Sequence, residues 1–222
     1  MTLPRTCGGT VSLVGDRAVY VRCRDREPDG RIVAYDLRRR TTTLITTAPD
    51  RGLDPVAAPG WVAYASSTTV GVELAPLREA TRRMRFVGGA DVYDVQADGK
   101  LAFIAGTRAC PGNQAVIPEL GWAAPHTPAT TLAPCVSSIG VAIAADRVLA
   151  VDIAQGPDRV TRYGLDGSSE VLATADAGSI RALDDDGATA AVVQRACGQE
   201  RVVLLTGSTA PADLTSAACP VG

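Results

Sequence analysis

The chain has 222 residues, of which 46% are apolar, and its net charge is −2. This near balance argues against a nucleic-acid-binding protein, because such proteins normally present a basic surface. No run of about 18 apolar residues occurs, so we expect no membrane insertion. Aromatic residues make up only 4% of the chain, so Val, Ala, Leu and Ile must form the core.

A tight turn followed by an apolar strand recurs along the chain. Its clearest form is 97–104, where Asp98-Gly99 is a strong hairpin signal because both residue types tolerate positive φ. The equivalent turn positions are Asp16, Gly60, Gly99, Asp146 and Gly187. Their spacing gives a repeat of about 43 residues, which is typical of a four-stranded propeller blade.

Each repeat has the pattern of four short strands, with the turn between the first and the second. We predict first strands at 10–14, 53–58, 92–97, 139–144 and 180–184, and second strands at 17–21, 61–64, 100–104, 147–151 and 188–193. We predict third strands at 31–37, 70–77, 114–120, 159–165 and 201–205, and fourth strands at 41–47, 82–87, 130–133, 170–174 and 212–215.

The sequence therefore predicts an all-β fold, a five-bladed β-propeller of four-stranded antiparallel blades. We expect a single domain over 1–222, with blades at about 8–51, 52–89, 90–136, 137–177 and 178–219. One blade cannot bury both of its faces, whereas five blades packed around an axis can. The alternative is a non-repetitive β-sandwich whose turns have this spacing by accident.

Two segments carry a resemblance to a known family. The turn and strand of 97–104 resemble the repeat of TolB-type β-propellers, which has a Pro-Asp-Gly-Lys-like turn and then an Ile-Ala-Phe-like strand. The segment 31–37 resembles the third strand of the same repeat. The resemblance implies a propeller fold for the whole chain. It implies little chemistry, because TolB-type repeats occur in binding proteins, in periplasmic scaffolds and beside peptidase domains.

Six cysteines indicate an oxidising compartment. Three of them follow the second strand of a repeat, namely Cys23, Cys110 and Cys197; the other three, Cys7, Cys135 and Cys219, lie between repeats. Both kinds of loop emerge on one face of an up-and-down propeller. We therefore predict the disulfides Cys7–Cys23, Cys110–Cys135 and Cys197–Cys219.

The cysteine pattern does not suit a metal centre, because no C-x-x-C occurs and the single histidine, His126, is not at ligand spacing from any cysteine. The first ten residues lack the apolar segment of a signal peptide. We expect that a leader has been removed and that the protein is secreted, extracellular or on the cell surface.

Two charged segments allow a second interpretation. Arginines occur at 22, 24, 26 and 38–40, and acids lie between them at 25, 27, 29 and 36. This mixture is typical of a solvated hairpin, and a contact with phosphate or an acidic polymer is the alternative. Asp184-Asp185-Asp186 precedes Gly187, which is typical of a hydrophilic turn. A Ca²⁺ contact is the alternative, but Ca²⁺ needs six or more oxygen ligands from spaced positions.

We place the candidate site at the mouth of the propeller channel, where the first strands begin and the connecting loops converge. The residues expected to line it are Arg51, Asp54, Asp91, Ser138, Ser179 and Arg181. The sequence favours a non-enzymatic module that binds a protein or a glycan there, without a metal or another cofactor.

Two other functions remain open. Five-bladed propellers include glycosidases, which use a carboxylate pair, and Asp54 with Asp91 or Asp94 could supply one. The Glu usual for the acid is missing from every predicted first strand. The other alternative is a structural unit of a larger surface assembly, which would make contacts through blade edges or the disc face. Exposed apolar patches or an unpaired edge at residues 1–10 would favour it.

Overall fold

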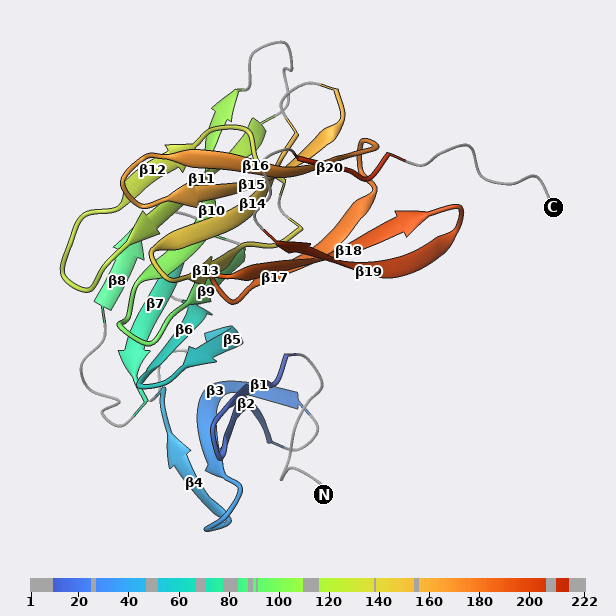
Figure 1. Cartoon of the computed structure of the whole chain (residues 1–222). Helices are drawn as coiled ribbons and strands as arrows, with labels where there is room; N and C mark the ends of the chain where they lie inside the picture. Colours follow the sequence, from blue (N-terminus) through green and yellow to red (C-terminus); the bar gives the residue numbers. More distant parts are fainter. Residues whose placement is uncertain are drawn as a thin grey trace. The chain divides into compact units, whose positions relative to one another are not determined.

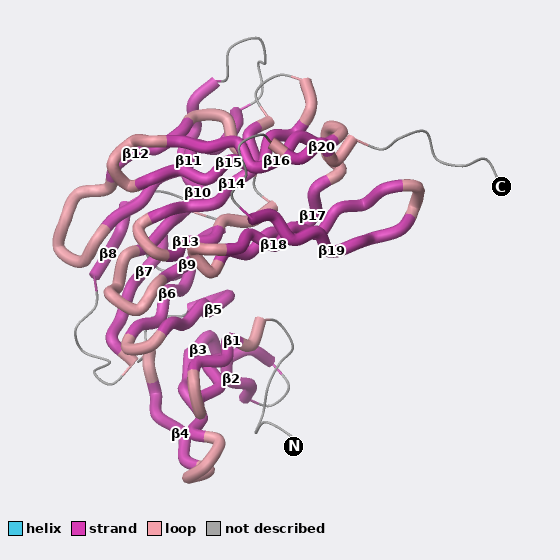
Figure 2. The backbone as a smooth tube through the Cα atoms, in the orientation of Figure 1, coloured by secondary structure: helices cyan, strands magenta, loops and turns pink. Residues whose placement is uncertain are grey.

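The computed structural model describes residues 10–24, 27–46, 52–66, 71–77, 84–87, 90, 92–109, 116–137, 139–153, 156–206 and 211–215. Within these ranges the chain forms twenty β-strands and no helix (Figures 1 and 2). A helix long and apolar enough to cross a membrane is accordingly not found in the described part of the chain. The prediction of an all-β fold is confirmed.

The strands follow the predicted repeat. The first repeat contains β1 Ser12–Val14, β2 Arg17–Arg24, β3 Glu27–Asp36 and β4 Thr41–Leu44. The second contains β5 Gly52–Ala58, β6 Trp61–Ser66, β7 Gly71–Pro76 and β8 Met84–Val87. The third contains β9 Val92–Val95, β10 Leu101–Ala109, β11 Val116–Ala123 and β12 Thr130–Ala133.

The last two repeats begin in the same way. The fourth contains β13 Ala142–Ala144, β14 Arg147–Asp152, β15 Asp158–Gly164 and β16 Ser169–Ala175. The fifth contains β17 Ile180–Asp185, β18 Thr189–Ala196 and β19 Gln199–Thr206, and the chain continues to β20, Ala212–Asp213.

The strands of each repeat pair in chain order, but the sheets differ in size. The first three sheets have four strands each, in the orders β1-β2-β3-β4, β5-β6-β7-β8 and β9-β10-β11-β12. The fourth has five, β13-β14-β15-β16-β20, and the fifth has three, β17-β18-β19. The prediction that 212–215 forms the fourth strand of the fifth sheet is wrong, because β20 pairs in parallel with β16 instead.

The chain divides into two compact units. The first comprises Met1–Leu101 and Ala123–Ala129, and the second comprises Ala102–Trp122 and Thr130–Gly222. In the first unit, Val19 and Ile32 of the first sheet are buried together with Val62 and Tyr64 of the second. The second unit has its own core, in which side chains from the fourth and fifth sheets pack together.

The turns of the repeats share a backbone hydrogen bond. The amide of the residue that follows the third strand donates to the carbonyl of the first turn, as in Leu37 to Asp16 (2.8 Å) and Leu165 to Asp146 (3.0 Å). The turn predicted at Asp98-Gly99 joins β9 to β10, and within it Gly99 has positive φ whereas Asp98 does not. Asp98 stabilises the turn with its side chain, whose Oδ1 accepts from the Lys100 amide at 3.0 Å.

Candidate functional site

Three of the six residues predicted at the channel mouth, Arg51, Asp91 and Ser138, lie outside the described residues. Asp54 lies in β5 and is exposed, with φ of 46°. Its carbonyl accepts a hydrogen bond from the Tyr93 hydroxyl at 2.7 Å, and that hydroxyl accepts from the Ala65 amide at 2.7 Å. Asp54 therefore helps to hold β5, β6 and β9 together through its backbone.

Ser179 and Arg181 belong to the second unit and lie at the start of β17. Arg181 is exposed. Ser179 is only 8% exposed, and its hydroxyl has no hydrogen-bond partner among the described residues. Its carbonyl accepts from the Arg195 amide at 2.8 Å, which ties the start of β17 to the end of β18. A ligand site that includes all six predicted residues stays a prediction.

The carboxylate pair of the glycosidase alternative also falls partly outside the described residues, because Asp91 does. Asp94 lies in β9, where its Oδ1 accepts from the Val95 amide at 2.8 Å. Glu73, on β7, is buried, and its Oε2 accepts from the Tyr64 hydroxyl at 2.7 Å. No glutamate was predicted on a first strand, and Glu73 lies on the third strand of its repeat.

Cysteine chemistry is described at two positions. Cys135 and Cys197 are each disulfide-bonded, and no free cysteine occurs among the residues that the structure describes. Their predicted partners, Cys110 and Cys219, lie outside those residues, as does Cys7. The side chain of Cys23 is likewise not described. The three pairings therefore stay predictions.

The structure places a groove of about 780 Å³ in the first unit, at the end of the first two sheets where the β1–β2, β3–β4 and β5–β6 turns lie. This is the end of the strands opposite to the β2–β3 loop. Val14 and Leu77 supply apolar lining. The charged side chains of the lining come from the β1–β2 and β3–β4 turns, namely Asp16, Arg17, Asp36, Arg38 and Arg39.

Both carboxylates of this groove already have protein partners. Asp16 Oδ2 lies 2.8 Å from Arg38 Nε. Asp36 Oδ1 accepts from the backbone amides of Arg39 at 2.8 Å and Arg38 at 3.0 Å. The hydrogen bond from the Arg39 amide is the main reason why the pKa of Asp36 lies below its ordinary value, and the charges of Arg39 and Arg17 lower it further. The groove thus has three arginines and two carboxylates, and one of the arginines, Arg38, is already paired with Asp16.

The fourth sheet has a smaller hollow at the same place in its repeat. Its volume is about 260 Å³, and its lining includes Asp146, Arg147, Leu165 and Asp166. Asp166 Oδ1 accepts from the amide and the hydroxyl of Ser168 at 2.9 and 2.6 Å, which is the capping that Asp36 performs in the first sheet. Among the described residues that line this hollow, only Arg147 is an arginine, so the shared turn geometry does not by itself gather cations.

Sequence reasoning treated the arginines of 38–40 as a solvated hairpin and did not identify the groove. The turns that form it are about 20 residues apart in the chain. The β1–β2 and β3–β4 turns meet because β2 pairs with β3, and the β5–β6 turn joins them only when the second sheet packs against the first. One signal was available. Arg17 directly follows the turn of the first repeat, and Arg38-Arg39 falls in the next turn on the same end of the sheet.

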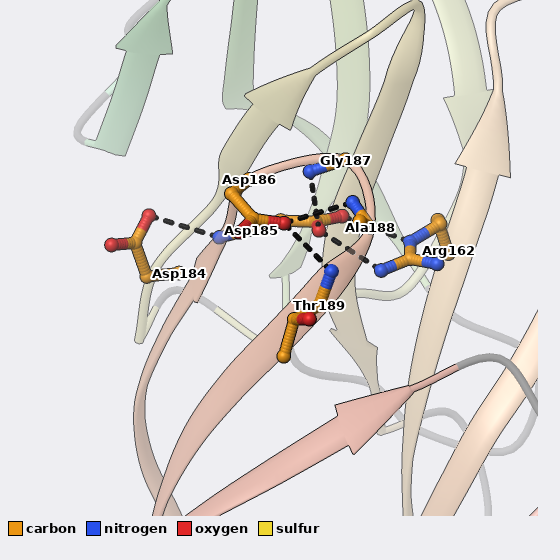
Figure 3. A network of polar contacts seen from close by, with 7 residues as sticks. All are labelled: Arg162, Asp184, Asp185, Asp186, Gly187, Ala188 and Thr189. Atoms are coloured by element: carbon orange, nitrogen blue, oxygen red, sulfur yellow. Dashed lines mark hydrogen bonds and ion pairs between the residues drawn. The ribbon is translucent and has the colours of Figure 1, made fainter.

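The acidic turn of the fifth repeat is a structural network (Figure 3). Asp185 is buried and bonds bidentately to Arg162 of β15, with Nε–Oδ2 and Nη2–Oδ1 distances of 2.9 Å. Asp186 Oδ1 accepts from the amides of Ala188 and Thr189 at 2.8 and 2.7 Å. Asp184 Oδ1 accepts from the Asp185 amide at 2.9 Å. Each of the three carboxylates therefore has a donor within the protein.

Comparison with known proteins gives the fold and no family. No protein-family model matches the sequence, and no curated protein matches it. Among solved structures, the chain is similar to the β-propeller domain of the trilobed protease from Pyrococcus furiosus, at 15% identity and a TM-score of 0.62, over 89% of this chain and 68% of that one.

Two further structures show the same likeness. A nidogen–laminin complex matches at 16% identity and a TM-score of 0.54, over 86% of this chain and 78% of that one. TolB from Acinetobacter baumannii matches at 14% identity and a TM-score of 0.51, over 72% of this chain and 41% of that one. At these identities the comparisons establish a β-propeller type of fold, and they do not single out the TolB type.

Proposed function

We propose that this protein is a non-enzymatic binding module that holds an acidic glycan or an acidic protein segment in the groove at the turn end of the first two sheets. The observation that supports this is a groove lined by three arginines and two carboxylates, in which Arg38 is paired with Asp16 and Asp36 accepts from two backbone amides. Arg17 and Arg39 are the cations proposed to hold the ligand. Guanidinium groups suit carboxylate and sulfate ligands because their forked donors match two ligand oxygens.

This proposal moves the site from the channel mouth to the opposite end of the strands. The size of the groove, about 780 Å³, lies within the range of small-molecule and oligosaccharide sites. Its apolar side chains, Val14 and Leu77, offer a surface for the carbon skeleton of a sugar or a peptide. We further infer a secreted or cell-surface location with the three disulfides as predicted, which the oxidised state of Cys135 and Cys197 supports.

The test is binding of the full oxidised chain to immobilised polyglutamate, polygalacturonate and dextran sulfate, with neutral dextran as the reference. We expect retention on the acidic polymers only, and weaker retention as salt rises, because exposed charges are screened. The double variant R17Q/R39Q should weaken binding about tenfold or more, since a hydrogen bond to a charged group contributes about 1.5–3 kcal/mol.

The control is Arg147→Gln, because Arg147 follows the equivalent turn of the fourth sheet and is exposed, as Arg39 is. It removes one positive charge but leaves the groove unchanged, so binding should fall little. Equal losses in R17Q/R39Q and in the control would mean diffuse charge attraction and would contradict the site. Release of reducing sugar would contradict the non-enzymatic assignment in favour of the glycosidase alternative.

A further inference from the structure

The fifth sheet differs from the other sheets at its outer edge. In the first four sheets the third strand is covered by a fourth, β4, β8, β12 or β16. In the fifth sheet β19 is the last strand, because β20 joins β16. Within the described residues, no strand pairs with the outer side of β19 (Figure 1). A strand in this position presents a row of backbone donors and acceptors to any extended segment that fits it.

The side chains of β19 alternate between the core and solvent. Val203 and Leu205 face the core that the fourth and fifth sheets share. Val202 and Leu204 point away from it, and each is 68% exposed. Natural edge strands usually carry a charge or a proline that discourages pairing. From 202 to 206 this strand carries neither.

The chain's own predicted fourth strand is held elsewhere. The Leu214 amide donates to the Thr174 carbonyl of β16 at 2.7 Å, and the Leu214 side chain is buried in the shared core. The Leu214 carbonyl accepts from Nε2 of Gln194, which is fully buried in β18. Moving this segment to β19 would break these bonds and expose Leu214, so within the described part of the chain the segment 211–215 does not cover the edge of β19.

We propose that β19 pairs in antiparallel fashion with β19 of a second copy of this chain, with Val203 on the twofold axis. Opposed residues of an antiparallel pair share one face of the sheet. This register sets Val202 opposite Leu204 of the partner subunit, and Leu204 opposite Val202 of the partner subunit. All four exposed apolar side chains then pack in one cluster across the junction.

The ends of the strand fit the same register. Glu200 lies opposite Thr206 of the partner subunit, so no two like charges face each other. A register centred on Val202 would instead set Glu200 opposite Leu204 of the partner subunit, and one centred on Leu204 would set Val202 opposite Thr206 of the partner subunit. Of these three registers, only the one centred on Val203 pairs every exposed apolar side chain with another. Because the strand matches itself in this register, the occupant that we propose for this edge is a second copy of the chain.

The first measurement is sedimentation equilibrium of the full oxidised chain across a range of concentrations. We expect a reversible dimer, and Leu204→Lys should raise its dissociation constant at least about tenfold, because the substitution places a charge in the apolar cluster. Leu13→Lys is the matched control: Leu13, on β1 in the other unit, is also 68% exposed. It should leave the dimer intact. Since both positions are exposed, thermal unfolding should show that both variants fold.

Hydrogen exchange at low and high protein concentration identifies the occupant. The amides of β19 should gain protection as the dimer forms, whereas those of β1 should not. A wild-type chain that stays monomeric at millimolar concentration would overturn the proposal. So would full protection of both sides of β19 in the monomer, because the edge would then be covered by another part of the same chain. Neither outcome involves the groove of the first unit, so the proposed ligand site is tested separately.

Discussion

The fourth and fifth sheets start from the same repeat and end with five and three strands. In both, a tight turn joins the first two strands and a third strand follows in antiparallel register. They differ in the strand that comes next. β16 has seven residues and remains with its own sheet, whereas β20 has two and joins its neighbour. The comparison shows that the repeat fixes the first three strands, and that burial of side chains decides the place of the last.

The two sheets are joined by polar as well as apolar contacts. Arg162 on β15 and Asp185 on β17 are 3% and 0% exposed at their side chains and form the bidentate ion pair of Figure 3. The shared core brings Leu149 and Val160 of the fourth sheet to Val192 and Leu205 of the fifth. A sheet of three strands needs a buried apolar face to be stable. The shared core with the fourth sheet is where the fifth sheet buries its apolar side chains.

The largest expected effect is from Asp185→Asn. The substitution keeps the shape of the side chain but leaves the buried guanidinium of Arg162 without its counter-charge. Breaking a buried ion pair in this way costs about 4 kcal/mol, which urea unfolding at neutral pH would measure.

The control for this variant is Asp186→Asn in the same turn. Asp186 is exposed, and an amide oxygen can still accept from the Ala188 and Thr189 amides. We expect a much smaller loss of stability. Similar losses in the two variants would contradict the view that the Arg162–Asp185 pair joins the sheets.

The next largest effect is expected from Leu214→Ala, which tests where β20 is held. The Leu214 side chain is 6% exposed within the shared core, so its truncation should reduce the free energy of unfolding by about 3 kcal/mol. Leu13→Ala is the control, because Leu13 is 68% exposed and lies outside the proposed dimer contact, so its truncation should change stability by less than about 0.5 kcal/mol. The reverse order would place the 211–215 segment away from this core.

The difference between the two sheets also shows what sequence reasoning could reach. The turn positions and the approximate ranges of the first three strands of each repeat were predictable because they depend on local patterns of period two and on residues that tolerate turns. The parallel pairing of β20 was not, because it depends on Leu214 and Gln194 meeting across two sheets. The same holds for Arg162 and Asp185, which are 23 residues apart in neighbouring repeats.

The candidate site was harder to predict for a related reason. The arginines that line the groove of the first unit lie at the β1–β2 and β3–β4 turns. Pro59 and Gly60 of the next repeat line its far side. No local pattern in the sequence joins these segments. A search of the arginines by repeat position would have found that Arg17 and Arg38-Arg39 lie at the same end of one sheet.

The smallest expected effect compares a turn glycine of the fifth sheet with one of the fourth. Gly187 and Gly167 both have φ of 90°, so alanine at either position carries backbone strain of about 1–2 kcal/mol. They differ in their surroundings. A Cβ at Gly187 would lie 2.8 Å from Ala145 Cβ in the turn of the fourth sheet, whereas a Cβ at Gly167 would meet nothing within 4 Å.

Gly187→Ala should therefore destabilise the protein by about 1 kcal/mol more than Gly167→Ala, because one turn must move away from the other. Thermal unfolding of the two variants side by side measures this difference with the backbone strain cancelled. Equal losses would mean that the turns of the fourth and fifth repeats do not touch in solution. The excess at Gly187, together with the loss in Asp185→Asn, would show that the two sheets are held together at their turn ends as well as through the core.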